Sequence, residues 1–159
     1  MERVDKVMNY PAFRENMEKI EKAEVDRFFC RHGLNHVLDV ARIFYILVLE
    51  EGISVDKELV YATALLHDIG RYEQYEKGTP HNEAGAKLAG EIMASCGFSE
   101  EECAMAVNAI KGHRRDSNDS DLFGHLLYKA DKLSRDCYQC KAEPECYWSA
   151  EQKNMWVKY

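Results

Sequence analysis

A histidine and an aspartate stand side by side at the end of an apolar run, in Leu65-Leu66-His67-Asp68-Ile69-Gly70. Adjacent side chains on a helix point about 100° apart, so His67 and Asp68 cannot share one helical face. They can meet at one ion if a helix ends there and the ion lies between its last turn and the next segment. A buried aspartate is costly unless it is paired or metal-bound, so this pair predicts a metal site.

A second aspartate, Asp131, interrupts another apolar helical segment. Three histidines, His67, His81 and His113, fall at expected helix ends, and His36 lies near another. Helix ends cluster at one end of an antiparallel bundle, so these side chains can converge from different helices. Imidazole and carboxylate groups suit divalent transition metals, and a carboxylate can bridge two ions. We therefore predict one or two ions, without distinguishing Fe, Mn, Ni, Zn or Mg.

The elements that must position these residues have helical periodicity. Helices are predicted over about residues 13–29, 34–50, 57–67, 81–95, 100–112 and 121–137, with a polar loop over 71–79. Asp56 and Thr79 are candidate N-caps, Ser99 and Glu102 form a capping box, and Ser149 is a candidate cap for a short final helix. With no convincing strand pattern, the sequence predicts an all-α, single-domain bundle of about six or seven helices.

Composition and charge indicate one soluble domain over residues 1–159. The chain is 46% hydrophobic and 31% charged, with a formal net charge of −7. Such an acidic chain lacks the positive surface of a general nucleic-acid binder. Its longest apolar run, Ile43–Leu49, is far shorter than the roughly 20 residues that span a bilayer. Its first residues are charged where a signal peptide would be apolar, so we expect a cytoplasmic protein that binds neither nucleic acid nor membrane, of open oligomeric state.

An isolated His36 in Leu34-Asn35-His36-Val37, the His67-Asp68 pair and the distal Asp131 together resemble the HD superfamily of metal-dependent phosphohydrolases. The resemblance covers about residues 30–135, and a cysteine-containing tail follows over 137–159. It implies a helical fold, a metal centre and hydrolysis of a phosphoester. His32 lies four residues before His36 and competes for the first ligand position, but the Val-Ala sequence after His36 fits the family better.

Many two-metal members of this family have two further histidines between the pair and the last aspartate, and His81 and His113 occupy those places. The resemblance thus implies a six-residue ligand set: His36, His67, Asp68, His81, His113 and Asp131. Asp68 is the expected bridge. The alternative is one ion held by four of these residues, with His81 and His113 contacting the substrate phosphate. His125 belongs to no motif and is expected to be structural.

The resemblance implies attack of metal-bound hydroxide on phosphorus, with His67 and Asp68 at the reaction centre. The expected substrate is a nucleotide or another small phosphoester or phosphoanhydride. Basic residues beside the ligand motifs are candidates for binding its phosphate, namely Arg71, Lys111, Arg114 and Lys132. No Gly-Tyr-Pro triplet follows the pair, which argues against cyclic-di-GMP degradation. Two other functions stay open: a di-iron HD-type oxygenase, and an HD module that binds a nucleotide without turnover.

The tail carries Cys137 and Cys140 in a Cys-x2-Cys pattern, and Cys146 follows six residues later. Three thiolates suit a structural zinc or an iron–sulfur cluster but lack a fourth ligand. The remaining cysteines or a histidine are candidates for the fourth position: Cys30, Cys96 and Cys103. Reduced thiols beside a helix end and a redox-labile disulfide are the alternatives.

Overall fold

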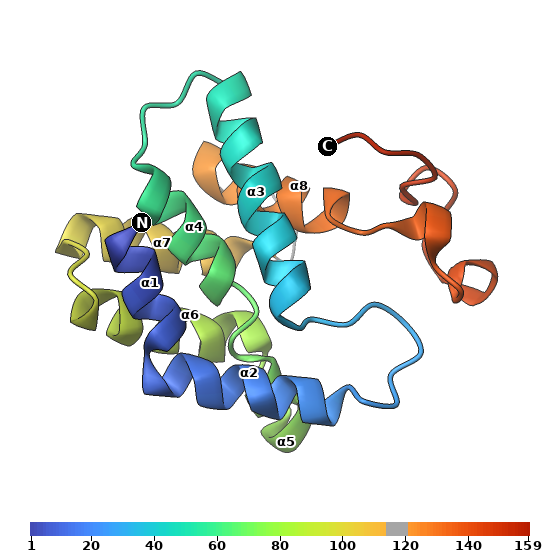
Figure 1. Ribbon diagram of the computed structural model, residues 1–159, viewed down its shortest axis with the longest axis horizontal. Coiled ribbons are helices and arrows are strands. Elements are labelled where there is room, and N and C mark those ends of the chain that lie inside the picture. The colour runs from blue at the N-terminus through green and yellow to red at the C-terminus, as the bar shows by residue number, and fades with distance from the viewer. Residues whose placement is uncertain (114–120) are drawn as a thin grey trace.

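The structure is a computed structural model of the chain, and it describes residues 1–113 and 121–159. These residues form eight α-helices and two short 3-10 helices (Figure 1). The α-helices are α1 (Glu2–Asn9), α2 (Pro11–Ala23), α3 (Leu34–Glu50), α4 (Lys57–Leu66), α5 (Arg71–Lys77), α6 (His81–Ser95), α7 (Glu100–Gly112) and α8 (Leu122–Leu133). The 3-10 helices η1 (Cys137–Gln139) and η2 (Glu143–Glu145) lie in the tail. Among the described residues, no helix is long and apolar enough to cross a membrane.

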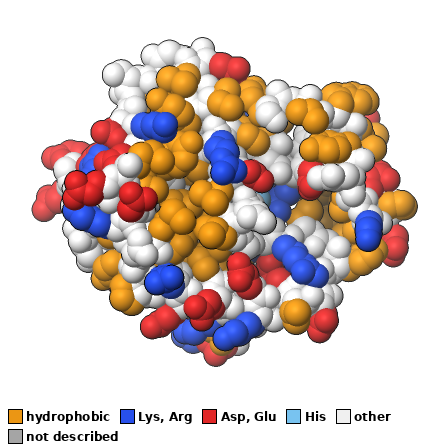
Figure 2. Space-filling view, in the orientation of Figure 1, with side chains coloured by type: hydrophobic (Ala, Val, Ile, Leu, Met, Phe, Trp, Pro, Cys, Tyr) orange, Lys and Arg blue, Asp and Glu red, His pale blue; other side chains and the backbone are white. Residues whose placement is uncertain are grey.

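The central helix is α3, because apolar residues surround most of its circumference. It packs against α4 and α8, while α6 packs against α7 (Figure 1). Val40, Phe44 and Leu47 of α3 are buried in one core with side chains of the other long helices. Hydrophobic side chains also gather on the surface over α3 and α4, with charged side chains around them (Figure 2). The predicted all-α fold class is confirmed.

Two of the predicted helix starts are confirmed by their hydrogen bonds. The Asp56 carboxylate accepts a bond from the backbone N–H of Glu58, and Ser99 and Glu102 form the reciprocal capping box that opens α7. The other two predicted caps, Thr79 and Ser149, were wrong. The N-cap of α6 is Pro80 rather than Thr79. Residues after Ser149 form a turn without a helix.

The prediction of a loop over residues 71–79 was also wrong, because most of it forms α5. This helix has no fully buried side chain, so it lacks the apolar period from which a helix is detected. Its residues are mostly good helix formers, and Gly78, with φ of 76°, ends it. The helices predicted to reach residues 29 and 137 end earlier, at Ala23 and Leu133.

A close backbone contact joins the end of α4 to α6. A Cβ atom added to Gly70 would lie 2.3 Å from the carbonyl oxygen of His81 and 2.4 Å from the backbone nitrogen of Gly85. Only glycine permits this approach, and it places the His67-Asp68 pair against the first turns of α6. The small residues of α6 therefore serve to bring two predicted ligand segments together.

A buried polar pair holds the irregular connection between α2 and α3. The Glu24 carboxylate accepts a hydrogen bond from the backbone N–H of His32 at 2.7 Å, and its other oxygen lies 2.6 Å from His32 Nδ1. The Tyr75 hydroxyl of α5 also donates to Glu24. Burial lowers the pKa of His32 to about 4 and outweighs the opposing contact with Glu24. At neutral pH, His32 is thus a neutral donor to an ionised carboxylate.

Replacing Gly70 by alanine should destabilise the fold by about 3 kcal/mol, because the new methyl group meets backbone that cannot rotate away. Chemical denaturation measures this as a lower free energy of unfolding. Gly90→Ala is the matched control, since its Cβ would meet only the Val107 side chain, at 3.3 Å. Its unfolding free energy should change by no more than about 1 kcal/mol. Equal effects of the two substitutions would contradict the proposed role of the Gly70 contact.

Acidification should destabilise the fold through His32. Its folded pKa, about 4, lies below the ordinary 6.5, so between these values the unfolded chain binds a proton that the folded chain does not. This stability is present above pH 6.5 and is lost as the pH falls toward 4. From pH 7 to pH 5 we expect wild type to lose about 1–2 kcal/mol more than His32→Asn. Parallel pH profiles of unfolding free energy would contradict this assignment.

Candidate metal centre

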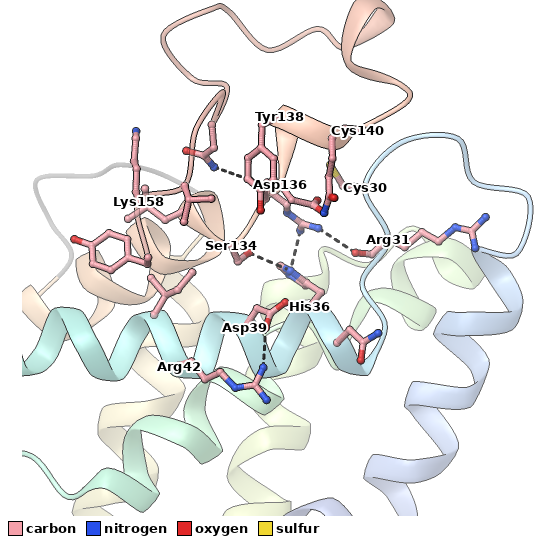
Figure 3. Close-up of a pocket in the computed structure, with 18 of the residues that line it drawn as sticks. Cys30, Arg31, His36, Asp39, Arg42, Ser134, Asp136, Tyr138, Cys140 and Lys158 are labelled. Carbon is pink, nitrogen blue, oxygen red and sulfur yellow. Dashed lines mark hydrogen bonds and ion pairs between the residues drawn. The ribbon is translucent and has the colours of Figure 1, made fainter.

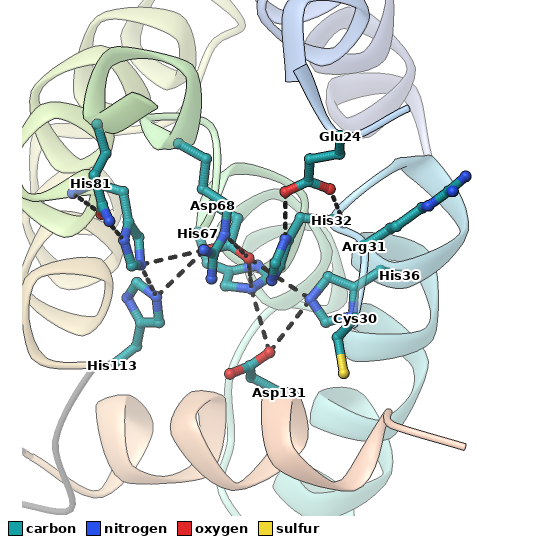
Figure 4. A network of polar contacts seen from close by, with 12 residues as sticks. Glu24, Cys30, Arg31, His32, His36, His67, Asp68, His81, His113 and Asp131 are labelled. Atoms are coloured by element: carbon teal, nitrogen blue, oxygen red, sulfur yellow. Dashed lines mark hydrogen bonds and ion pairs between the residues drawn. The ribbon is translucent and has the colours of Figure 1, made fainter. Parts of the chain in front are cut away.

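The structure brings the six predicted ligands into one buried cluster, and each comes from near a helix end (Figure 4). His36 lies in the first turn of α3, and His67 and Asp68 follow the last residue of α4. The other three positions are His81, which opens α6, His113, which follows α7, and Asp131, in the last turn of α8. The His67 side chain is completely buried. Five helices therefore meet at this point.

One group of potential ligand atoms comes from His36, His67, Asp68 and Asp131, and all of its members lie within 4.8 Å of one another. The Nε2 atom of His36 is 3.3 Å from Asp131 Oδ1 and 3.7 Å from Asp68 Oδ2. The Nε2 atom of His67 is 3.3 Å from the same Asp68 oxygen. Two imidazoles and two carboxylates thus face one another around a small space.

A second group consists of Asp68, His81 and His113. The other oxygen of Asp68, Oδ1, is 3.4 Å from His81 Nε2 and 3.7 Å from His113 Nε2. The two histidine Nε2 atoms are 3.3 Å apart. Asp68 therefore belongs to both groups and presents one oxygen to each, which is the arrangement of a bridging carboxylate.

Hydrogen bonds on the far side of each ring fix the histidine tautomers. The Nδ1 atoms of His67 and His113 each lie 2.6 Å from the backbone carbonyl three residues earlier. Gln74 Oε1 lies 2.6 Å from Nδ1 of His81, and Ser134 Oγ lies 3.2 Å from Nδ1 of His36. These partners make each Nδ1 a donor, so all four Nε2 lone pairs face the cluster. Such outer hydrogen bonds typically orient metal-ligating histidines.

The cluster fits a divalent cation because three of its central polar atoms make no hydrogen bond. Among the described residues, His67 Nε2 and both oxygens of Asp68 are buried without a hydrogen bond. Buried polar groups are costly unless they are satisfied, and a bound cation would satisfy all three atoms.

The charged groups of the cluster also shift one another's pKa values. Burial alone would raise the pKa of Asp68, but the charges of His67 and Arg71 lower it well below its usual range. Burial likewise opposes protonation of His67, yet the Asp68 charge raises the pKa of His67 to about 9. A proton and a cation therefore compete for His67 Nε2.

The predicted substrate-binding residues lie in different places. Arg71 Nε is 2.9 Å from Asp68 Oδ2, and Lys132 Nζ is 2.7 Å from Asp131 Oδ2. Both cations thus contact carboxylates of the cluster. Lys111 is exposed on the last turn of α7. Arg114 lies outside the described residues.

Arg135 contacts the cluster and was not predicted from the sequence. One of its terminal nitrogens lies 3.0 Å from His36 Nε2 and 3.3 Å from Asp131 Oδ1. The other donates to the backbone oxygen of Arg31. Figure 3 shows His36 and Ser134 at the edge of the large cavity, about 630 Å³, that Arg135 also lines. Its position four residues after Asp131, within the helix that the sequence predicts over 121–137, is the signal that could have identified it.

His32 stays outside both groups, although its ring packs edge-on against His36 with centroids 5.5 Å apart. The Nδ1 atom of His32 is hydrogen-bonded to the Glu24 carboxylate, so His32 supports the cluster by packing against His36. His125 is half-buried elsewhere on α8.

The cysteines of the tail are all free thiols. Cys137, Cys140 and Cys146 line one cavity together with Cys30. Among the described residues, only the two histidine–aspartate groups gather three or more ligand atoms within 4.8 Å. No three thiols of the described residues meet this distance, so the structural metal expected at the tail stays a prediction.

Comparison with known proteins matches residues 33–136 to the HD domain family. An uncharacterized protein of Clostridium beijerinckii is 42% identical over 159 residues, which is the full length of both chains. Ribonuclease Y of Enterococcus faecalis is 34% identical over 111 residues, which are 68% of this chain and 20% of that protein. The chain thus spans about a fifth of the length of the ribonuclease Y relatives it matches.

A solved structure is also similar, the crystal structure of a predicted HD superfamily hydrolase from an uncultured Thermotogales bacterium. It superposes with a TM-score of 0.63 and is 27% identical, covering 91% of this chain and 83% of that one. The matched region, residues 33–136, contains all six residues of the buried cluster. The chain therefore belongs to the HD domain family.

Proposed function

We propose that this protein is a metal-dependent hydrolase that cleaves a small phosphoester or phosphoanhydride, with a nucleotide as the preferred class of substrate. The observation that carries the proposal is the position of Asp68, whose two buried oxygens each face a different set of histidines. This arrangement suits two divalent ions that share one carboxylate.

His36, His67 and Asp131 would hold one ion and His81 and His113 the other, with Asp68 between them. When bound, such ions would lower the pKa of a coordinated water and stabilise negative charge on the phosphoryl group. The four Nδ1 hydrogen bonds orient the imidazoles toward the cluster, which both ion binding and a reproducible substrate position require.

Basic residues beside the cluster would bind the phosphate. Arg71, Lys132 and Arg135 all contact Asp68 or Asp131. Once cations neutralise those carboxylates, the three side chains have unused donors for phosphate oxygens. Arginine in particular offers a planar, bidentate match to a phosphate group. The centre could thus attract an anion even though the chain has a net charge of −7.

The similar proteins support hydrolysis without fixing the substrate. The Thermotogales protein is described as a hydrolase and the Enterococcus protein as a ribonuclease. We favour a small substrate over RNA because the overall charge is acidic, and phosphate contacts dominate nucleic-acid affinity. A short RNA therefore belongs in the substrate panel as the competing outcome.

Wild type should bind metal and hydrolyse at least one member of a panel of nucleotides and simple phosphoesters, and Asp68→Asn should not. Loss of the shared carboxylate should lower the hydrolysis rate by at least about 10³-fold, since metal stabilisation of the transition state amounts to several kcal/mol. Elemental analysis and phosphate release measure both properties.

Asp39→Asn is the matched control, because this α3 aspartate is half-exposed and its ion pair within the described residues is with Arg42. It should retain metal and full activity. Equal hydrolysis rates for wild type and Asp68→Asn would show that the buried cluster is not the active site. Hydrolysis of the RNA and of no small phosphoester would show that RNA is the substrate class. A mixed-valent di-iron spectrum without phosphatase activity would favour an oxygenase.

His113→Ala should reduce the bound metal from two ions to one per chain. His113 belongs only to the second group, so the other four-residue group stays intact. The measurement is metal content after equilibrium dialysis, with a thermal melt to confirm folding. One ion in both wild type and variant would instead favour the single-ion arrangement, with His113 contacting substrate.

A further inference from the structure

A cavity of about 190 Å³ lies between the metal centre and the C-terminal tail. On one side it is lined by Arg71, Asp131 and Arg135, which contact or belong to the cluster. On the other side it is lined by tail residues, including Trp148 and Lys153. The tail lies beyond residue 136, where the match to the HD domain family ends. This wall is therefore a feature that the family match does not include.

Hydrogen bonds fix the tail to the helix that carries Asp131. The buried Asn154 side chain donates to the backbone oxygens of Lys132 and Arg135, at 2.8 and 2.9 Å. Carbonyl groups at a helix C-terminus lack their usual intrahelical partners, so Asn154 supplies donors to acceptors at the end of α8. The backbone oxygen of Asn154 in turn accepts from Tyr138. The tail wall thus has a defined position relative to the metal centre.

The charge of this cavity suits an anion. Five basic side chains line it against three acidic ones, in a chain whose net charge is −7. One acidic side chain is Asp131, which a bound cation would neutralise. Local positive charge in a partly enclosed, low-dielectric site concentrates anionic ligands.

An aromatic ring stands at the far side of the same basic groups. Lys132 Nζ lies 5.9 Å from the ring centroid of Trp148 and 2.7 Å from Asp131 Oδ2. Trp148 is half-buried and is one of the residues that line the cavity. Stacking on an aromatic side chain strengthens binding of a nucleobase about 5- to 150-fold. The cavity is smaller than the ~300–1,000 Å³ of pockets for drug-sized ligands, so it suits one part of a substrate.

We propose that the C-terminal tail, residues 137–159, forms the leaving-group side of the substrate site, and that Trp148 is a specificity-determining residue that stacks on a planar aromatic leaving group such as a nucleoside. The inference rests on the proposed function for the position of the phosphate at the metal centre. The larger cavity beside His36 is the competing location, and Trp156 lines that cavity but not this one.

The test compares wild type, Trp148→Ala, Trp148→Phe and Trp156→Ala, each as the full chain loaded with Mn²⁺. Isothermal titration calorimetry measures binding of two uncleavable phosphonates, the analogues of AMP and of glycerol phosphate, in which a methylene group replaces the ester oxygen. Trp148→Ala should bind the AMP analogue at least about 10-fold more weakly and the glycerol analogue unchanged. Trp148→Phe should restore much of the difference, and Trp156→Ala should match wild type.

The inference is overturned if Trp148→Ala weakens both analogues equally or neither, if wild type binds neither, or if Trp156→Ala shows the selective loss instead. Hydrolysis of AMP and glycerol phosphate, measured in parallel, separates the two proposals. Selective, Trp148-dependent binding without cleavage of any phosphoester would refute the hydrolase function while supporting the pocket. Cleavage of both esters with unchanged specificity in Trp148→Ala would support the hydrolase function and refute the role of Trp148 in the pocket.

Discussion

The structure depends on a carboxylate, Asp68, buried among four imidazoles. Its two oxygens have no hydrogen-bond partner among the described residues, although Arg71 lies 2.9 Å from one of them. Burying such a group carries a large desolvation penalty. The surrounding positive charge, and a geometry that suits bound cations, offset that penalty. The ends of five helices meet where this carboxylate lies, so the architecture and the metal centre follow from the same constraint.

Each ligand is held by hydrogen bonds or backbone contacts that come from its own or a neighbouring helix. His67 and His113 bond to carbonyl groups one turn earlier on their own helices, and these bonds are available only because each helix ends at the histidine. Gln74 of α5 orients His81, although α5 contributes no fully buried side chain of its own. The Gly70 contact then sets the spacing between the two halves of the centre.

The tail extends the chain beyond the part that matches the HD domain family. It is irregular, with two 3-10 helices and five exposed large hydrophobic side chains in its final 13 residues. Its attachment to α8 through Asn154 nevertheless places Trp148 beside the basic side chains that contact the cluster. Metal binding within residues 33–136 and recognition of the leaving group by the tail would then be separate properties of one site.

The sequence by itself determined the helical class and two of the helix caps, because periodicity and capping are local signals. The placement of polar residues in apolar runs pointed to a metal site, and the resemblance to the HD superfamily selected the six residues of the cluster. The sequence did not determine the helix α5 or the early ends of α2 and α8. The contact of Arg135 with the cluster and the pairing of His32 with Glu24 were decided only by the tertiary structure. The physical reason is that these features depend on which groups meet across helices, and burial and pairing between distant segments leave no local period in the chain.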